Sequence, residues 1–332
     1  MQDYISEYRG KTILITGGAG CIGSNLTKAL VRAGAKKVLV MDDLSSSYRW
    51  NVPDDPEVAF VEGSVLDEEA LKMVFFQEPQ YVFHLAALFA NQNSIDHPQQ
   101  DLLVNGLGTL KVLQYARMAK VERVLFASSG CSVYGSQAPL PLREDFLCIK
   151  LDTPYQITKL LGELYCNFFH NLYGLPVVRA RFFNVYGPGE VPGKYRNVIP
   201  NFVYLALQGR PLPITGTGEE TRDFTFVEDI VDGTLRAAVS TEAVGDAFNL
   251  ASGTETSVLT IANAVNELVG NSSGVEFRPK REWDKSTRRR ASIEKASAVL
   301  GYQPKTEIKA GMKRTIDWIV KNREQIERSA KF

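Results

Sequence analysis

A glycine-rich turn close to the start of the chain constrains the fold more than any other feature. The apolar run KTILIT (11–16) leads into TGGAGCIG (16–23), which contains the pattern GxGxxG between an expected strand and an expected helix. In that context the turn binds a dinucleotide diphosphate, because small residues admit a close backbone approach and the helix N-terminus supplies N–H donors. About 20 residues later, Asp42 ends the next apolar run, where a carboxylate accepts from ribose hydroxyls and repels a 2′-phosphate. The pattern therefore favours NAD over NADP.

Short apolar runs alternate with amphipathic segments over the first half of the chain, and this alternation predicts the fold class. The expected strands are 11–16, 37–42, 58–62, 81–85, 124–128 and 177–183, and the expected helices are 24–33, 104–118 and 155–172. Apolar strands separated by helices are typical of βαβ units whose parallel sheet is covered on both faces. We therefore expect an α/β fold with a doubly wound parallel Rossmann sheet and a smaller mixed α/β lobe.

The pattern becomes less regular after Asn184, where a Gly/Pro-rich segment, YGPGEVPGKYRN (186–197), begins. We place an NAD-binding domain at 1–183 with a return segment at about 224–250, and a substrate-binding lobe at 184–223 and 251–332. Residues 278–332 hold 16 basic and 7 acidic side chains, whereas the whole chain has 38 of each. This basic end is compatible with an anion-binding lobe or with solvated helix faces.

The composition is that of an ordinary globular protein, with 44% hydrophobic and 23% charged residues among 332. A formal net charge of zero argues against a nucleic-acid partner. The four cysteines show no CxxC or Cys/His spacing, so we expect no disulfide framework and no metal. No signal peptide is visible, and the longest near-apolar run, Tyr81 to Ala90, is too short to span a bilayer. We expect a cytoplasmic protein without a membrane partner.

Tyr155 and Lys159 lie four residues apart in an expected helix, so their side chains share one face. An ammonium group beside a phenol stabilises the phenolate and lowers the phenol pKa from about 10 toward the working pH. Tyr155 is therefore a candidate general base that takes a proton from a sugar hydroxyl as hydride leaves the carbon. The position of this pair, well beyond a dinucleotide turn, argues against a chance occurrence.

Seven motifs together resemble the extended short-chain dehydrogenase/reductases, in their nucleotide-sugar epimerase and dehydratase branch. They are TGGAGCIG (16–23), MDDLSS (41–46), HLAA (84–87), SSGCSVYG (128–135), YQITK (155–159), RFFNVYGP (181–188) and TRDFTFVEDI (221–230). The resemblance spans nearly the whole chain and implies NAD as the cofactor and a nucleotide sugar as the substrate. It also implies a homodimer, in which two helices of each chain form a four-helix bundle.

The resemblance assigns roles to residues of this chain. The cofactor contacts that it implies are Gly17, Gly20, Cys21, Ile22, Gly23, Asp42, Asp43, Ser64, Val65, Leu85, Ala86, Ala87, Ser128, Tyr155, Lys159 and Phe183. The substrate contacts that it implies are Asn184, Asn197, Val198, Arg222, Arg288 and Arg289, where Arg222 and one of the last two arginines grip the diphosphate. Relatives usually carry Asp where Ser64 stands, so one adenine contact differs here.

The segment around Gly130 departs from the pattern of these relatives. They carry a Ser or Thr at that position as the partner of the catalytic tyrosine, and here the hydroxyl is absent. We expect Ser132, two residues on and on the same side of the strand, or a water molecule to take this catalytic role. The alternative for Ser132 is a turn hydroxyl whose hydrogen bonds are satisfied locally.

The same segment separates the chemistries of the branch. Dehydratases and uronate decarboxylases carry a Glu at the position of Ser132, and the dehydratases carry an Asp at the position of Cys131. Neither acid is present, so the acid and base for proton abstraction at carbon and for elimination are missing. The neutral pair is closer to the pattern of UDP-glucose 4-epimerases. Cys131 itself is either an acid–base group or a small packed thiol.

These residues predict an NAD-dependent nucleotide-sugar 4-epimerase, with a UDP-sugar as the expected substrate. Tyr155 would take the proton of the 4-OH while hydride leaves C4, and the hydride would return to the other face of the 4-keto sugar. The alternatives are a 3,5-epimerase/reductase, a dehydratase or a decarboxylase acting on a nucleotide sugar. A catalytically weak module that binds NAD and a nucleotide sugar is a further alternative, which Gly130 favours. The stripe Leu160, Leu164, Phe168 and Leu172 belongs either to a dimer interface or to the core.

Overall fold

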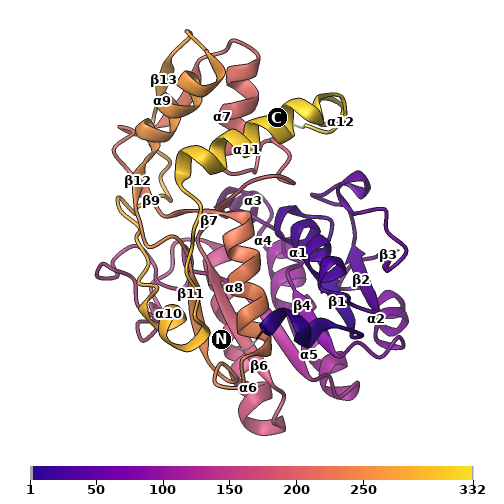
Figure 1. The fold of residues 1–332 in the computed structure, drawn as a ribbon. Coiled ribbons are helices and arrows are strands. Elements are labelled where there is room, and N and C mark those ends of the chain that lie inside the picture. Colours follow the sequence, from indigo (N-terminus) through magenta and orange to yellow (C-terminus); the bar gives the residue numbers. More distant parts are fainter. Residues whose placement is uncertain (1–2, 331) are drawn as a thin grey trace.

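The computed structural model describes residues 3–330 and 332, and a parallel sheet of seven strands forms its centre (Figure 1). The strands are β1 (Thr12–Thr16), β2 (Lys37–Asp42), β3 (Val58–Glu62), β4 (Tyr81–His84), β5 (Arg123–Ser129), β6 (Val177–Phe182) and β11 (Ala247–Leu250). Their spatial order is β11-β6-β5-β4-β1-β2-β3, so the strand order reverses between β1 and β4. This sheet confirms the predicted fold class. In such sheets, ligands bind outside the carboxyl ends of the strands at the point of reversal.

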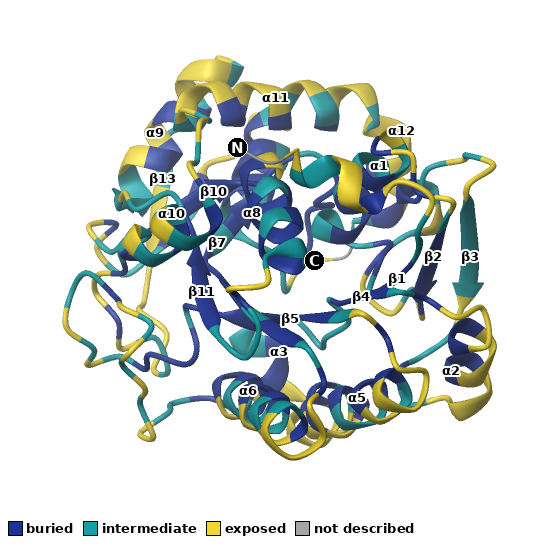
Figure 2. Cartoon of the chain, turned by 60° about the horizontal axis from the view of Figure 1, so that its bottom comes forward, coloured by how far each residue is buried: buried dark blue, intermediate teal, exposed yellow. Residues whose placement is uncertain are grey.

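Helices cover both faces of the sheet (Figure 2). One face carries α2 (Glu68–Phe75), α5 (Thr109–Met118) and α6 (Pro154–Tyr173), and the other carries α1 (Cys21–Arg32), α8 (Val227–Val239) and the short η1 (Tyr4–Tyr8). Successive side chains of a strand point to opposite faces. Accordingly, Ile13 and Ile15 join the core beside α1, whereas Leu14 joins the core beside α5 and α6. The sheet is therefore buried on both sides.

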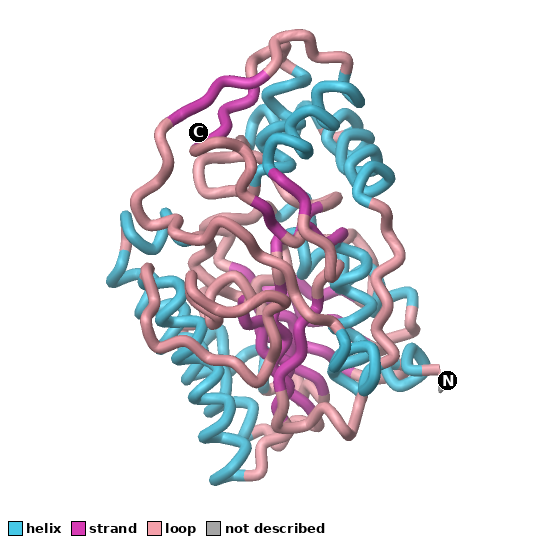
Figure 3. The backbone as a smooth tube through the Cα atoms, turned by 90° about the vertical axis from the view of Figure 1, so that its left-hand side faces the viewer, coloured by secondary structure: helices cyan, strands magenta, loops and turns pink. Residues whose placement is uncertain are grey.

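A smaller lobe of helices and short strands lies beyond the carboxyl ends of the sheet (Figures 1 and 3). Its helices are α7 (Val198–Leu207), α9 (Val258–Val269), α11 (Ile308–Lys321) and α12 (Arg323–Ser329), whereas α10 (Glu294–Leu300) packs beside β11 and α8 of the sheet domain. Its strands pair as β7 (Asn184–Tyr186) with β10 (Phe224–Phe226), β8 (Leu212–Thr215) with β13 (Val275–Arg278), and β9 (Thr221–Arg222) with β12 (Thr256–Ser257). Only the last pair is antiparallel. Apolar side chains of α7, α9 and α11 pack together in the core of this lobe.

The chain returns from the lobe to the large sheet, because α8 packs beside β5 and β6 and β11 pairs with β6 in parallel. These elements lie between residues 227 and 250, the region for which a return segment is expected. The division into two independent units stays a prediction. Among residues 3–330 and 332, no helix is long and apolar enough to cross a membrane.

The helix that carries Tyr155 has clear local start and stop signals. The Thr153 hydroxyl accepts from the backbone N–H of Gln156, Pro154 occupies the first turn, and Gly174 ends the helix with a φ of 67°. The expected helix at 104–118 begins differently. Its first part, η3 (Leu102–Gly108), has a wider turn than an α-helix and follows α3 (Asn91–Asp96) and α4 (Pro98–Asp101). A further short turn, η2 (Arg49–Asn51), follows β2.

Candidate functional site

A cavity of about 510 Å³ lies at the carboxyl ends of the sheet, where the strand order reverses, and extends toward the smaller lobe. Its lining includes every site residue predicted from the sequence except Ser132 and Arg288. The glycine turn, β2 and the segment after β4 contribute the end next to α1. The segments around 183–201, 213–224 and 281–289 contribute the other end. Residues that are far apart in the sequence thus share one site.

The glycine turn has the close contacts that a diphosphate-binding loop requires. Gly17 has a φ of 72°, and a Cβ atom there would lie 2.6 Å from the backbone nitrogen of Ala86. A Cβ atom at Gly23 would lie 2.5 Å from the carbonyl oxygen of Gly17, so the helix packs tightly on its own turn. The nearest atom to a Cβ at Gly20 is 3.4 Å away, which leaves the helix N-terminus accessible from the cavity. These features fit the diphosphate of NAD.

Asp42 stands at the end of β2 and is held in place by three donors. Its carboxylate accepts from the backbone N–H of Ala19 at 2.9 Å, from the N–H of Leu44 at 2.9 Å and from the hydroxyl of Ser47 at 2.5 Å. Burial raises the pKa of Asp42, although these hydrogen bonds oppose the change. The oriented carboxylate lines the cavity and is available to a ribose hydroxyl, as the fit to NAD requires.

Tyr155 and Lys159 both line the cavity, and the Lys159 ammonium lies 5.6 Å from the centre of the Tyr155 ring. Lys159 donates to the carbonyl oxygen of Ala127 at 2.8 Å, which fixes its side chain against β5. Burial lowers the pKa of Lys159 to about 8, although the nearby Asp101 carboxylate opposes the change. Burial also raises the pKa of the Tyr155 phenol above its usual range, and Asp101 and Cys131 add to this. The lower Tyr155 pKa that the sequence predicts from Lys159 is therefore not seen in this structure.

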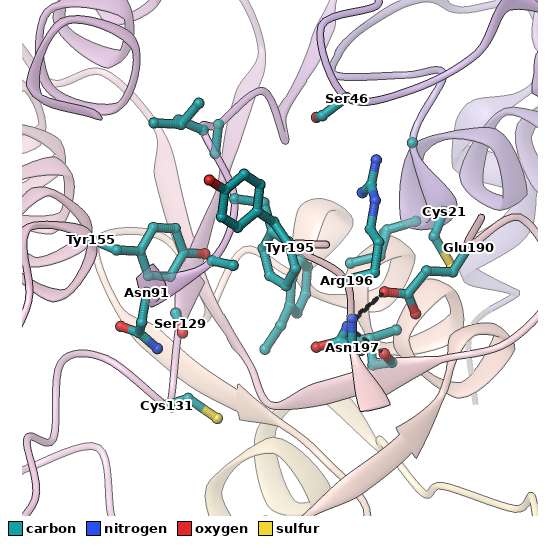
Figure 4. Close-up of a pocket in the computed structure, with 18 of the residues that line it drawn as sticks. Cys21, Ser46, Asn91, Ser129, Cys131, Tyr155, Glu190, Tyr195, Arg196 and Asn197 are labelled. Atoms are coloured by element: carbon teal, nitrogen blue, oxygen red, sulfur yellow. Dashed lines mark hydrogen bonds between the residues drawn. The ribbon is translucent and has the colours of Figure 1, made fainter. Parts of the chain in front are cut away.

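The position of the missing hydroxyl is filled by an aromatic ring. A Cβ atom at Gly130 would lie 2.1 Å from Cε2 of Phe183, so the ring packs directly on the glycine. Ser132 is fully buried and donates its hydroxyl to the Ser129 hydroxyl at 2.9 Å. Ser129, and not Ser132, lines the cavity (Figure 4). Ser132 can thus reach a bound molecule only through Ser129.

Cys131 lines the cavity beside Asn184, and its thiol donates to the Asn184 side-chain oxygen at 3.3 Å. Burial raises the pKa of the thiol, although the charges of Arg289 and Arg222 oppose the change. The thiol is therefore neutral near pH 7 and acts as a hydrogen-bond donor there.

The sequence does not show whether Arg288 or Arg289 enters the site, and the structure distinguishes them. Arg289 is buried, lines the cavity and donates to the Ser286 hydroxyl at 2.8 Å, while its Nη1 has no partner among the described residues. Arg288 lies outside the cavity, is exposed and forms an ion pair with Glu255. Arg222 lines the cavity and is paired with Asp284 at 2.8 Å. Of the arginines expected to bind the substrate, Arg222 and Arg289 therefore reach the cavity, and Arg288 does not.

Several lining residues were not found from the sequence. They include Ser46, Phe89, Asn91, Gln92, Ser129, Glu190, Tyr195, Arg196 and Trp283. Several contacts join α3 to the far segments. The Tyr195 hydroxyl donates to Asp96 at 2.7 Å, and the Trp283 indole donates to Gln92 at 2.8 Å. Only the Gly/Pro-rich composition of 186–197 signalled a functional loop in this region.

The NAD dependent epimerase/dehydratase family matches residues 13–251 of the chain. The chain belongs to this family. A UDP-glucose 4-epimerase from Mycolicibacterium smegmatis is 36% identical over 94% of this chain and 99% of its own length. A UDP-N-acetyl-alpha-D-glucosaminuronate decarboxylase from Bacillus cytotoxicus is 32% identical over 93% of this chain and 97% of its own length. Family members with different reactions thus resemble this chain to a similar degree.

Two solved structures of the family are similar to this protein over nearly its whole length. The epimerase Mth375 from Methanothermobacter thermautotrophicus has 57% identity and a TM-score of 0.98, covering 99% of this chain and 98% of that one. WbmF from Bordetella bronchiseptica, in complex with NAD+ and UDP, has 38% identity and a TM-score of 0.85, covering 97% and 96%. The family is NAD-dependent, and NAD is the cofactor that the glycine turn and Asp42 would hold.

Proposed function

We propose that this protein is an NAD-dependent 4-epimerase of a UDP-sugar. The observation that carries the proposal is the Tyr155–Lys159 pair inside the cavity, with no carboxyl group at positions 131 and 132. A site with this tyrosine and no carboxyl group at those two positions favours reversible oxidation at a hydroxyl-bearing carbon over elimination or decarboxylation. Similarity to a UDP-glucose 4-epimerase and to a structure containing UDP supports the choice of substrate.

NAD held by the glycine turn and Asp42 would supply the hydride acceptor and donor for the sugar C4. Tyr155 removes the proton of the 4-OH as the C–H bond breaks, and it returns a proton to the oxygen when the hydride comes back. Lys159 holds the nicotinamide ribose and places a positive charge beside Tyr155. The 4-keto sugar must turn over between the two steps, so the hydride returns to its opposite face. The overall reaction inverts one centre and consumes no second substrate.

Ser129 is the hydroxyl that we assign as the partner of Tyr155. It lines the cavity next to Gly130, and the Ser132 hydroxyl behind it donates to its oxygen. This bond leaves the Ser129 proton free to point toward a bound sugar oxygen. Ser132 then has a positioning role, in place of the direct role expected from the sequence. Ser129→Ala should lower kcat more than Ser132→Ala, and Ser132→Thr should restore the activity that Ser132→Ala loses.

The smaller lobe holds the nucleotide in this proposal. Arg222 and Arg289 present guanidinium groups to the cavity, and such groups match the oxygens of a diphosphate. Asn197 and Val198 line the same end, at the start of α7. This arrangement supports the proposed division into an NAD-binding unit and a substrate-binding lobe.

We also propose a homodimer through α6. Leu164, Phe168 and Leu172 are 51%, 46% and 62% exposed, whereas Leu160 packs against the protein core. Exposed apolar side chains also occur at Leu103 and Leu107 of the neighbouring η3, and contiguous apolar patches of this kind mark protein interfaces. Light scattering should give twice the mass of one chain for the wild type and the single mass for Phe168→Glu. A monomeric wild type would contradict the proposal.

A nucleotide-sugar decarboxylase is the second candidate, because a named decarboxylase is 32% identical over most of the chain. Proton NMR in D₂O, with NAD and a panel of UDP-hexoses and uronates, separates the two. A 4-epimerase gives a sugar with altered couplings at C4 and no deuterium on carbon, because the hydride returns directly. Loss of the C6 carboxylate from a uronate would indicate a decarboxylase. Deuterium at C3 or C5 would indicate an enolising epimerase, and either result would overturn the proposal.

A further inference from the structure

Glu190 has a buried carboxyl oxygen with no partner in the described part of the chain. The residue is 5% exposed and lines the cavity between Cys21 and Asn197 (Figure 4). Its Oε1 accepts from the Asn197 side-chain nitrogen at 2.9 Å and from the Asn197 backbone N–H at 3.3 Å. Its Oε2 receives no hydrogen bond from residues 3–330 or 332. Buried polar atoms are nearly always paired, so an unpaired one beside a cavity indicates a ligand.

The segment that carries Glu190 is fastened to the helix that receives the cofactor diphosphate. Asn25 of α1 donates to the carbonyl oxygen of Pro188 at 2.7 Å, and Asn51 donates to that of Gly189 at 2.8 Å. A Cβ atom at Gly189 would lie 3.3 Å from the Cα of Cys21. Glu190 is therefore held next to the first turn of α1, across from the N–H groups that face a diphosphate.

The charges around Glu190 do not match those that a buried carboxylate needs. Arg196, on the same loop, forms no ion pair with it among the described residues, although its charge lowers the Glu190 pKa. From α1, the Cys21 thiol faces Glu190, and burial raises its pKa well above the usual value, so the thiol is neutral. Lys28 of α1 acts on the pKa of Cys21 but is not among the charges that shift the pKa of Glu190. Burial raises the pKa of Glu190 to about 7, despite Arg196 and the bonds from Asn197.

We propose that Glu190 binds the diphosphate of NAD as a neutral acid, with Oε2–H donating to a phosphate oxygen. An ionised Glu190 would place a negative charge beside two phosphates and would weaken binding. The neutral acid instead supplies the donor that pairs the free oxygen, while Oε1 keeps its two bonds from Asn197. NAD affinity then decreases as Glu190 loses its proton. This inference concerns cofactor loading and does not depend on which sugar reacts.

The test is a titration of the whole protein with NAD at about pH 6 and pH 8, for the wild type and for Glu190→Gln. The wild-type Kd should rise about tenfold, because the acid form falls from about nine-tenths to one-tenth of the population. Glu190→Gln should change by less than about twofold, because its amide N–H donates at both pH values. Lys159 has a pKa of about 8, but its titration is common to both proteins and cancels in the comparison.

Glu144→Gln is the matched control variant. Glu144 is another glutamate whose pKa is raised by burial, but it contacts Asn249 and lies outside the cavity. This variant should keep the wild-type pH dependence of NAD binding. A parallel titration with UDP shows whether the Glu190 effect concerns the diphosphate of NAD or that of a nucleotide substrate. The proposal is overturned if wild-type NAD affinity does not change with pH, if Glu190→Gln keeps the wild-type change, or if the Glu190-dependent change appears with UDP alone.

Discussion

The two ends of the cavity are built in different ways. The cofactor end uses short contiguous segments, such as 17–23 and 85–87, that follow neighbouring strands of the parallel sheet. The substrate end uses single side chains from distant loops, such as Asn197, Arg222 and Arg289. A parallel sheet brings the carboxyl ends of its strands to one edge, so the first set comes together as a consequence of the fold class. The second set depends on how long loops fold back over that edge.

Removing the reacting hydroxyl at the cofactor end should cause the largest loss. Tyr155→Phe is expected to lower kcat by about 10²–10⁴ with the UDP-sugar that serves as substrate, because no other described group replaces the phenol. The Kd for NAD should stay within about twofold of wild type, since the glycine turn and Asp42 are unchanged. Steady-state kinetics and an NAD titration measure the two effects. A variant that keeps more than about a tenth of kcat would show that another group moves the proton.

At the substrate end, two adjacent arginines provide a matched pair. Arg289→Met should weaken UDP binding by about 10–100-fold, because the proposed bonds of this buried cation to phosphate oxygens would be lost. Arg288→Met should change the affinity by less than about twofold, because its exposed ion pair with Glu255 faces away from the cavity. Calorimetric titration with UDP distinguishes them. Equal losses of UDP affinity in both variants would mean that Arg289 has no specific role at the substrate end.

The smallest expected effect is a difference in stability between variants of two glycines at the cofactor end. Gly23→Ala should lower the free energy of unfolding by about 1–3 kcal/mol, because its Cβ would meet the Gly17 backbone at 2.5 Å. Gly20→Ala should change stability by less than about 0.5 kcal/mol, because nothing lies closer than 3.4 Å. It should weaken NAD binding instead, since the added methyl stands at the helix N-terminus. Urea unfolding and NAD titration provide both numbers, and equal unfolding energies would contradict this assignment.

Much of the sheet could be predicted because each strand is a local apolar run. The expected runs at 37–42 and 58–62 match β2 and β3 in both bounds, and 155–172 differs from α6 by one residue at each end. The helix expected at 104–118 starts earlier and with a wider turn. Asn105 there bonds to Asp101 and to the carbonyl of Leu88, contacts that periodicity does not reveal.

Less of the candidate site than of the sheet could be predicted from the sequence. The absent hydroxyl at Gly130 is visible in the sequence, but the Phe183 ring that occupies its place is 53 positions away. The expected position of Ser132 on the strand is wrong, because β5 ends at Ser129 and Ser132 lies in the following turn, where it faces Ser129 and not the cavity. The pKa of Tyr155 depends on burial and on Asp101, which lies on a different helix. Each difference comes from a neighbour that is distant in sequence.

The sequence by itself determined the fold class, the cofactor turn and the Tyr155–Lys159 pair, because each rests on spacing within a few residues. The tertiary structure alone decided which arginine enters the cavity, which serine lines it and where the unpaired carboxyl oxygen of Glu190 lies. The physical reason is the range of the interactions. Helix and strand periods follow from local geometry, whereas burial, pKa and unpaired donors are set by atoms that only the folded chain brings together.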